Sequence, residues 1–306
     1  MVMGNLGCVT HGTTMIYPSE AFDPGLTLQA IAQERATGLY GVPTMFIALL
    51  DHPQRAGFDL SSLRTGIMAG ATCPIEVMRR VISEMHMSEV QIAYGMTETS
   101  PVSIQTGPAD ELELRVTTVG RTQPHLENKL IDAEGQIVAR GEIGELCTRG
   151  YSVMLGYWNN PHATLEAIDS EGWMHTGDLA QMDEQGYVRI VGRNKDMIIR
   201  GGENIYPREL EEFFFTHPAV ADVQIVGIPD EKYGEEIVAW IKFHPGHTAN
   251  ELELQTWCKA RIAHFKTPRY FKFVDTFPMT VTGKIQKFKM REVSIQELGQ
   301  AGRGKS

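Results

Sequence analysis

Arg64-Thr-Gly-Ile-Met-Ala-Gly-Ala71 is a short apolar stretch that ends in a glycine turn, a pattern typical of a buried strand. A helix pattern follows, with Pro74 near its start and an apolar stripe that runs as far as Met85. Val90-Gln-Ile-Ala-Tyr94 then reads as a second strand. A strand, a helix and a strand at this spacing predict a βαβ unit with parallel strands. We therefore expect residues 1–115 to form an α/β subdomain.

The stretches before this unit continue the same pattern. Residues 24–37 predict a helix with Leu28 and Ile31 on one face, and residues 14–17 predict a buried strand. Residues 2–17 as a whole read as the interior of a buried α/β segment, without a polar lead-in. This start indicates that the chain lacks a front part.

From about Val116 the pattern becomes antiparallel. Short strands are expected at residues 127–131, 143–148, 179–182 and 187–191. Asp183-Glu-Gln-Gly186 joins the last two as a hairpin closed by glycine. We expect a β-barrel-like subdomain over residues 116–194.

After Gly192 helices and strands mix again. Helices are expected at residues 207–216 and 251–262, and strands at 222–228, 237–243 and 270–274. A boundary near Lys195 then separates a small α+β domain, residues 195–306, from the rest.

Bulk composition excludes several classes of protein. The formal net charge is −10, and the basic residues of 284–289 are too few to neutralise a nucleic-acid backbone. The 4 cysteines are far apart, without the spacing of a zinc site or a disulfide framework. No apolar run is long enough to span a bilayer, and the first residues make a poor signal peptide. We expect a cytoplasmic protein.

Two segments offer chemistry after predicted strands. In Tyr94-Gly-Met-Thr-Glu-Thr-Ser-Pro101, glycine allows close backbone approach, and Thr97 and Glu98 suit a phosphate oxygen and its Mg²⁺. In Gly172-Trp-Met-His-Thr-Gly-Asp178, the carboxylate suits the two hydroxyls of a ribose. Taken singly, each is also readable as a structural turn without a ligand.

Two later segments carry charge beside glycine. Val191 to Pro207 is a charged, glycine-punctuated junction, which suits a hinge or an ordinary polar linker. Phe277-Pro-Met-Thr-Val-Thr-Gly-Lys-Ile285 presents Lys284 after a turn of small residues, as a flexible point charge or a plain solvated lysine.

In this order, the four segments resemble the motifs of the adenylate-forming superfamily, from about Gly38 to Arg291. Within it, Arg200 to Pro207 and His264-Phe-Lys-Thr-Pro268 are similar to bacterial medium- or long-chain fatty acyl-CoA synthetases. The resemblance implies a truncated adenylate-forming fold: an α/β part, a β-barrel subdomain and an α+β lid domain. It also implies a ligase of fatty acid metabolism that uses ATP, Mg²⁺ and CoA, forms acyl-AMP and passes the acyl group to CoA.

The resemblance further implies roles for single residues. Tyr94 would stack on the adenine, and Asp178 with Arg193 would hold the ribose. Thr97 would contact phosphate, and Glu98 would bind Mg²⁺. The remaining nucleotide-binding positions are Gly70, Ala71, Gly95 and Ile190.

The other implied roles concern the acyl transfer. Lys284 would bridge the acyl carboxylate and the α-phosphate, supplying positive charge for an in-line displacement. Lys195 would be the hinge of the small domain, and Gly202 would line the pantetheine tunnel. The candidate acyl pocket consists of Ala69, Ala93 and Met96.

One part of the family pattern is absent. The glycine-, serine- and threonine-rich phosphate loop that ends in lysine is not in the chain, and His11-Gly-Thr-Thr14 has no such lysine. Each lost charge-assisted hydrogen bond is worth about 1.5–3 kcal/mol. We therefore expect this chain alone to be weakly active or inactive.

Two rival functions remain open: an adenylating enzyme that loads a carrier protein, and a non-catalytic AMP-binding fragment. A nicotinamide-dependent dehydrogenase is disfavoured because no GxGxxG opens a helix, and a P-loop ATPase because GxxxxGK[ST] is absent. The acid itself and the oligomeric state are not predicted.

Overall fold

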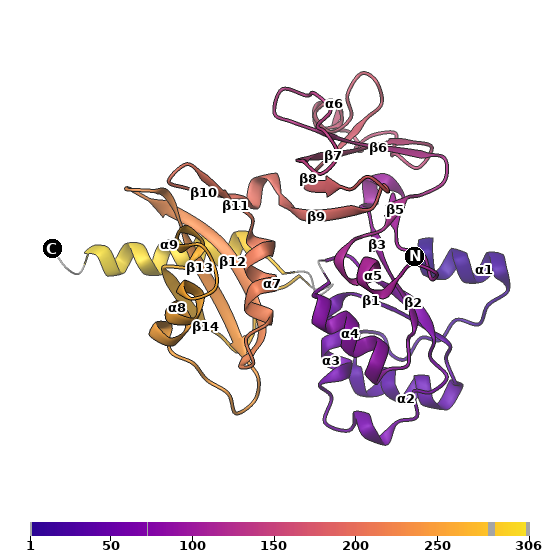
Figure 1. The fold of residues 1–306 in the computed structure, drawn as a ribbon. Helices are drawn as coiled ribbons and strands as arrows, with labels where there is room; N and C mark the ends of the chain where they lie inside the picture. The colour runs from indigo at the N-terminus through magenta and orange to yellow at the C-terminus, as the bar shows by residue number, and fades with distance from the viewer. Residues whose placement is uncertain (1, 72, 281–284, 304–306) are drawn as a thin grey trace. The chain divides into compact units, whose positions relative to one another are not determined.

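The computed structural model describes residues 2–71, 73–280 and 285–303 of the chain. These residues form two compact units, Met1–Ile190 and Val191–Ser306. The labelled elements of each unit can be followed in Figure 1. Among the described residues, no helix has both the length and the apolar character that a bilayer crossing requires.

The first unit contains a five-stranded sheet in the order β1-β2-β3-β4-β5. Its strands are β1 (Gly38–Gly41), β2 (Thr65–Ala69), β3 (Glu89–Tyr94), β4 (Ile104–Gln105) and β5 (Arg121–Thr122). The first three are parallel, and β4 and β5 each run antiparallel to the preceding strand. With α4 (Ile75–Glu84) between β2 and β3, the predicted βαβ unit is confirmed.

Helices and strands of this part share one core. The helices are α2 (Pro24–Glu34), α3 (Pro43–Leu50), α4 and α5 (Leu112–Thr117), with a short 3₁₀ turn at Arg55–Gly57. The Asp23 side chain caps α2 by accepting the Leu26 N–H at 2.7 Å, with proline at the first helical position. Leu28, Phe46 and Met68 are among the buried residues at the centre. Burial of such side chains is what holds these layers together.

The start of the chain differs from the prediction. Val2–Leu6 is a single π-helical turn and α1 is Gly7–His11. Residues 12–20 form no strand, and no residue from Val2 to Tyr17 is buried. The predicted buried strand at residues 14–17 is therefore wrong. A short apolar run specifies a strand only where a neighbouring strand pairs with it, and none of the described residues does so here.

The second sheet of this unit is antiparallel, with the order β6-β7-β8-β9. Its strands are β6 (Leu126–Ile131), β7 (Ile143–Gly150), β8 (Met174–Met182) and β9 (Val188–Arg193), and α6 (Pro161–Ala167) precedes β8. The predicted antiparallel structure is confirmed. Among the described residues the sheet has β6 and β9 as its two edges, so it is open where a barrel would be closed.

The second unit is an α+β domain. Its sheet has the order β11-β10-β13-β12, with β14 beside β13. The strands are β10 (Ile198–Arg200), β11 (Glu203–Ile205), β12 (Val220–Asp230), β13 (Gly234–Phe243) and β14 (Tyr270–Phe273). The helices are α7 (Pro207–Phe215), α8 (Glu251–Lys259) and α9 (Lys287–Arg303), with 3₁₀ turns at Asn194–Asp196 and His264–Lys266.

Alternation along β12 and β13 gives this sheet two apolar faces. Leu210 of α7 and Leu254 of α8 pack with Ile225 and other residues of one face. Met290 of α9 packs with Val226 and Trp240 on the other. The sheet is therefore covered by helices on both faces.

Candidate nucleotide site

The carboxyl ends of β2 and β3 lie at the same edge of the first sheet, because the two strands are parallel and in register at Ala69 and Ala93. Gly70 and Ala71 follow β2 directly, and both are exposed. Tyr94 ends β3. Gly70 has φ 88°, a conformation that favours glycine. Open α/β sheets bind ligands outside the carboxyl ends of their strands, so these residues stand where a ligand is expected.

The loop after β3 returns close to the strand. The Ser103 N–H donates to the Tyr94 carbonyl at 3.0 Å, and Thr97–Thr99 forms a 3₁₀ turn. A Cβ on Gly95 would lie 2.0 Å from the Pro101 carbonyl oxygen. Any side chain at this position would displace the backbone, so the loop conformation requires glycine here.

Two of the sequence motifs meet through side chains. The Tyr94 hydroxyl donates a 2.6 Å hydrogen bond to Asp178 Oδ2. Asp178 lies on β8 and is only 6% exposed. Folding thus brings the end of the sequence motif Gly172–Asp178 to the carboxyl edge of β3.

An irregularity in β8 directs Asp178. Cys147 of β7 is opposite His175, and Glu145 is opposite Leu179, so Leu146 alone faces three residues, Thr176–Asp178. Such bulges bend a strand and re-aim its side chains, often beside active sites.

Side chains stabilise this bulge. The Thr176 hydroxyl donates to the Leu146 carbonyl at 2.7 Å and accepts the Asp178 N–H at 3.1 Å. The Gly177 N–H donates to Glu145 Oε1 at 3.0 Å. Glu145 was not predicted as a site residue, and an acidic residue within a strand gave no sequence signal for this role.

Glu98 is also held by a residue that the sequence motifs did not identify. The Tyr157 hydroxyl donates to Glu98 Oε1 at 2.9 Å, and the Met154 N–H donates to the Glu98 carbonyl at 2.8 Å. The hydrogen bond to Glu98 raises the pKa of Tyr157 above its usual value, so the phenol stays protonated. Thr97 is exposed beside Glu98. A hydroxyl and a carboxylate are the hard oxygen donors that Mg²⁺ prefers.

The remaining predicted residues are distributed over both units. In the first, Ala93 is buried, Ala69 and Met96 are half-buried, and Ile190 packs against the core. In the second, Arg193 and Lys195 are exposed, Lys195 within the 3₁₀ turn Asn194–Asp196. Gly202 lies in the turn between β10 and β11 with φ 88°, and no described atom lies within 4 Å of the position of an added Cβ. Lys284 lies outside the described residues.

Arg200, the first residue of the Arg200–Pro207 segment, has a structural partner. Its guanidinium donates to Glu236 Oε1 at 2.9 Å and to the Phe265 carbonyl at 2.6 Å. Glu236 is 1% exposed. This arginine therefore neutralises a buried carboxylate within the second unit.

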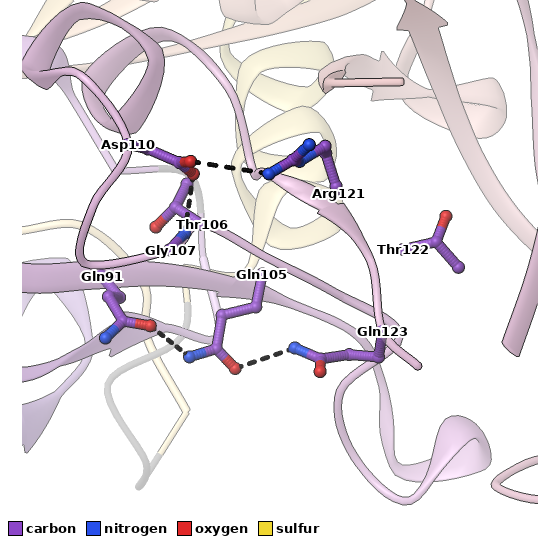
Figure 2. Close-up of a pocket in the computed structure, with 8 residues that line it drawn as sticks. All are labelled: Gln91, Gln105, Thr106, Gly107, Asp110, Arg121, Thr122 and Gln123. Atoms are coloured by element: carbon purple, nitrogen blue, oxygen red, sulfur yellow. Dashed lines mark hydrogen bonds and ion pairs between the residues drawn. The ribbon is translucent and has the colours of Figure 1, made fainter. Parts of the chain in front are cut away.

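An open polar pocket of about 530 Å³ lies on the first sheet (Figure 2). Gln105 donates to Gln91 at 2.6 Å and accepts from Gln123 at 3.1 Å, and Arg121 lies 3.9 Å from Asp110. The predicted nucleotide and acyl residues are not among those that line it. Its glutamines and charges do not suit an apolar acyl chain.

Comparison with known proteins agrees with this architecture. Residues 1–158 match the model of the AMP-binding enzyme family, and residues 209–284 match that of the AMP-binding enzyme C-terminal domain. The chain belongs to the family of AMP-binding enzymes, the adenylate-forming superfamily, and both the resemblance and the fold class predicted from the sequence are confirmed.

Named relatives are acyl-CoA synthetases and ligases. The chain is 56% identical over 296 residues to the putative acyl-CoA synthetase YngI of Bacillus subtilis (strain 168), covering 96% of this chain and 54% of that protein. It is 48% identical over 292 residues to the mitochondrial medium-chain acyl-CoA ligase ACSF2 of Homo sapiens, covering 95% and 48%. The chain thus spans about half the length of the curated relatives it matches.

A solved structure shows the same fold. ATP-bound MatB from Rhodopseudomonas palustris is similar with a TM-score of 0.85 and 32% identity, over 95% of this chain and 57% of that one.

Proposed function

We propose that this chain is the nucleotide-handling and lid part of an ATP-dependent acid–thiol ligase, which activates a carboxylic acid as acyl-AMP and transfers it to CoA. The hydrogen bond between Tyr94 and Asp178 carries the proposal, because it unites an aromatic ring and a buried carboxylate at the carboxyl edge of a parallel sheet. Those are the two groups that an adenosine would use, one for its base and one for its ribose.

The residues around this pair have distinct proposed roles. The backbone of Gly70 and Ala71, beyond β2, approaches the base from the side opposite the Tyr94 ring. Ile190 packs near the nucleoside, and Arg193 assists Asp178 at the ribose. Gly95 lets the loop pass close to the phosphates, because glycine presents no side chain there.

The phosphates would meet Thr97 and Glu98. Thr97 donates its hydroxyl to a phosphate oxygen, and Glu98 offers a carboxylate for Mg²⁺. When bound, Mg²⁺ would neutralise charge that develops on the triphosphate. Tyr157, protonated and bonded to one oxygen of Glu98, keeps that carboxylate in one orientation.

The second unit would supply the catalytic lysine and the second half-reaction. We assign Lys284 to the acyl carboxylate and the α-phosphate, Lys195 to the hinge, and Gly202 to the pantetheine tunnel. Gly202 has open space around it and φ 88°, so a substitution there strains the turn whether or not a thiol passes by. A tunnel test therefore needs Gly186→Ala as its control, a turn glycine with φ 83° and equally open space.

The names of the relatives support a proposal for the substrate class. Curated proteins 48–56% identical to this chain are named acyl-CoA synthetases and medium-chain acyl-CoA ligases. We propose a medium-chain acid as substrate, with Ala69, Ala93 and Met96 at its pocket. Ala69 and Ala93 are cross-strand partners, and both carry small side chains.

Acid-dependent exchange between ATP and pyrophosphate tests the first half-reaction. We would assay this chain and a chimera that adds the part of the Bacillus subtilis relative that it does not match. Lys284→Ala should abolish exchange, and Lys289→Ala, an exposed lysine of α9, should retain it. Equal exchange in both variants would refute the role of Lys284.

AMP binding tests the nucleotide site independently of catalysis. Asp178→Asn should weaken AMP binding roughly tenfold or more, as expected for loss of one charge-assisted hydrogen bond. Tyr187→Phe is the matched control, because Tyr187 donates to another carboxylate, Asp110, at 2.8 Å. AMP binding without exchange in any form would favour the non-catalytic alternative.

A further inference from the structure

A second group of side chains lies on the other side of the β8 bulge from the nucleotide motifs. Glu145 and Cys147 of β7 and His175 of β8 point their donor atoms at one another, all within 4.8 Å. The proposed ligase function uses none of these donor atoms. The strand register brings these side chains together, because Cys147 and His175 are direct cross-strand partners.

The distances between these donor atoms fit the edges of a metal-centred tetrahedron. Cys147 Sγ lies 3.7 Å from His175 Nδ1, and His175 Nδ1 lies 3.3 Å from Glu145 Oε2. With Zn–S of about 2.3 Å and Zn–N and Zn–O near 2.1 Å, those edges should be about 3.6 Å and 3.4 Å. The third edge joins Cys147 Sγ to the Glu145 carboxylate, and these atoms lie within 4.8 Å of one another. A small rotation of the half-buried Glu145 side chain would shorten this edge.

A carboxylate also stands behind the histidine. Asp169 Oδ2 lies 3.7 Å from His175 Nε2, the ring nitrogen that points away from Cys147. Asp169 is itself held by the N–H groups of Glu171 and Trp173, each at 2.9 Å. Metal-ligating histidines in proteins commonly have such a carboxylate on their second nitrogen, where it orients the ring.

The local charge suits a divalent cation. Glu145 and Asp169 contribute two negative charges and Lys129, which stacks on Trp173 at 4.4 Å, contributes one positive charge. Their sum is one net negative charge, and it becomes two when the Cys147 thiol loses its proton. Sulfur and imidazole donors select a borderline-soft metal over Mg²⁺.

We propose that Cys147, His175 and Glu145 form a site for Zn²⁺ or a similar borderline-soft divalent ion, with Asp169 as the residue that positions the histidine. Glu145 binds through Oε2, since its Oε1 accepts the Gly177 N–H. Three protein ligands leave one position for water. The metal would join β7 to β8 next to the bulge that carries Asp178.

Metal binding must release a proton. A cysteine thiol has a usual pKa of about 8.5, so the sulfur is protonated in the metal-free protein at neutral pH. Zinc takes the thiolate, and the proton leaves to solvent. At pH 8, where free imidazole is neutral, a site made only of histidine and carboxylate would release almost none.

Cobalt titration of the reduced, chelator-treated chain tests the proposal, because a thiolate ligand gives Co²⁺ a charge-transfer band. We expect one Co²⁺ per chain with this band, displaced by Zn²⁺. Cys147→Ser should remove the band, and His175→Ala should weaken binding at least tenfold. Asp169→Asn should weaken it about 10- to 100-fold while the band remains.

Cys258→Ser is the matched control. Cys258 is fully buried in the second unit, as Cys147 is in the first. This variant should bind Co²⁺ as the parent does. An unchanged band in Cys147→Ser, or no stoichiometric binding to the parent, would overturn the proposal.

Proton release covers the case in which Cys147→Ser does not fold. Zinc added to the parent chain at pH 8 in weak buffer should release about one proton per metal bound. Release near zero would mean that the metal binds elsewhere, at surface histidines, and would also overturn the proposal.

Discussion

The hydrogen bond between Tyr94 and Asp178 makes a quantitative prediction for a double-mutant cycle. Tyr94→Phe removes the donor, and Asp178→Asn replaces a charged acceptor with a neutral one of the same shape. The bond is short, 2.6 Å, and Asp178 is 6% exposed. Charge-assisted hydrogen bonds contribute about 1.5–3 kcal/mol and neutral ones about 0.5–1.5 kcal/mol. We expect a coupling of about 1–2 kcal/mol in the free energy of unfolding of the first unit.

The assay must follow the first unit alone, because the chain has two compact units and a single transition is not assured. Trp173 is buried and directly precedes β8, the strand that carries Asp178. When 5-fluorotryptophan is incorporated, its ¹⁹F resonance reports the unfolding of this unit in urea. The tryptophans of the second unit, Trp240 and Trp257, give separate resonances.

A control cycle pairs Asp178→Asn with Tyr187→Phe. Tyr187 donates to Asp110, so it shares no hydrogen bond with Asp178, and the two free-energy changes should add within about 0.5 kcal/mol. A coupling below about 0.5 kcal/mol for Tyr94 and Asp178 would refute the reasoning, because the contact would then contribute nothing beyond a neutral bond.

Three substitutions test other parts of the fold. Gly95→Ala should lower the unfolding free energy by about 1–3 kcal/mol and abolish AMP binding, because its Cβ would lie 2.0 Å from the Pro101 carbonyl. Burial raises the Asp222 pKa from 3.8 to about 6, so the folded state holds the proton more tightly and stability falls as pH rises from about 4 to 6. Asp222→Asn should therefore flatten that slope and raise the unfolding free energy at pH 7 by up to about 3 kcal/mol, measured by urea unfolding across this pH range. Glu236→Gln should cost about 3–5 kcal/mol in the second unit, because Arg200 would lose its buried partner.

Each substitution has a matched control. Gly57→Ala adds a Cβ with no described atom within 4 Å and should leave AMP binding unchanged. Asp230 is the comparison for Asp222. Backbone hydrogen bonds from Tyr233 and Lys232 lower the pKa of Asp230, so its ionised form stabilises the folded state. That stabilisation is lost as the pH falls, which is the opposite of the pH dependence expected from Asp222. Glu297 pairs with Lys272 at an exposed site, and Glu297→Gln should cost at most about 1 kcal/mol. A Glu236→Gln effect equally small would contradict the assignment of a buried ion pair.

Periodicity in the sequence determined the element types where an apolar face repeats. The strands at β2, β3, β12 and β13 and the helix α7 begin and end within a few residues of their predicted bounds. Both the alternation of strands and the helical stripe are local properties, and local propensity agrees there with the final packing. Residues 14–17 show where prediction from local sequence fails, because a strand needs a partner strand that the local sequence does not specify.

At the beginning of β8 the opposite error occurs, because residues that were not predicted as a strand belong to one. The sequence predicted a strand only from Leu179, whereas β8 begins at Met174. Thr176 and Gly177 read as a turn, and in the fold they are a bulge within the strand, paired to β7 on both sides. Turn residues inside a strand are consistent with either structure until the partner strand is known.

Each motif could be recognised in the sequence by itself, and the resemblance to the family assigned its chemical role. Only the tertiary structure decided which side chains contact one another. Tyr94 and Asp178 are 84 positions apart, and their contact depends on a sheet edge and on the bulge that Glu145 holds. The cross-strand pair of Cys147 and His175 likewise follows from register. Contacts between distant residues depend on backbone geometry summed over whole elements, which no local stretch of sequence specifies.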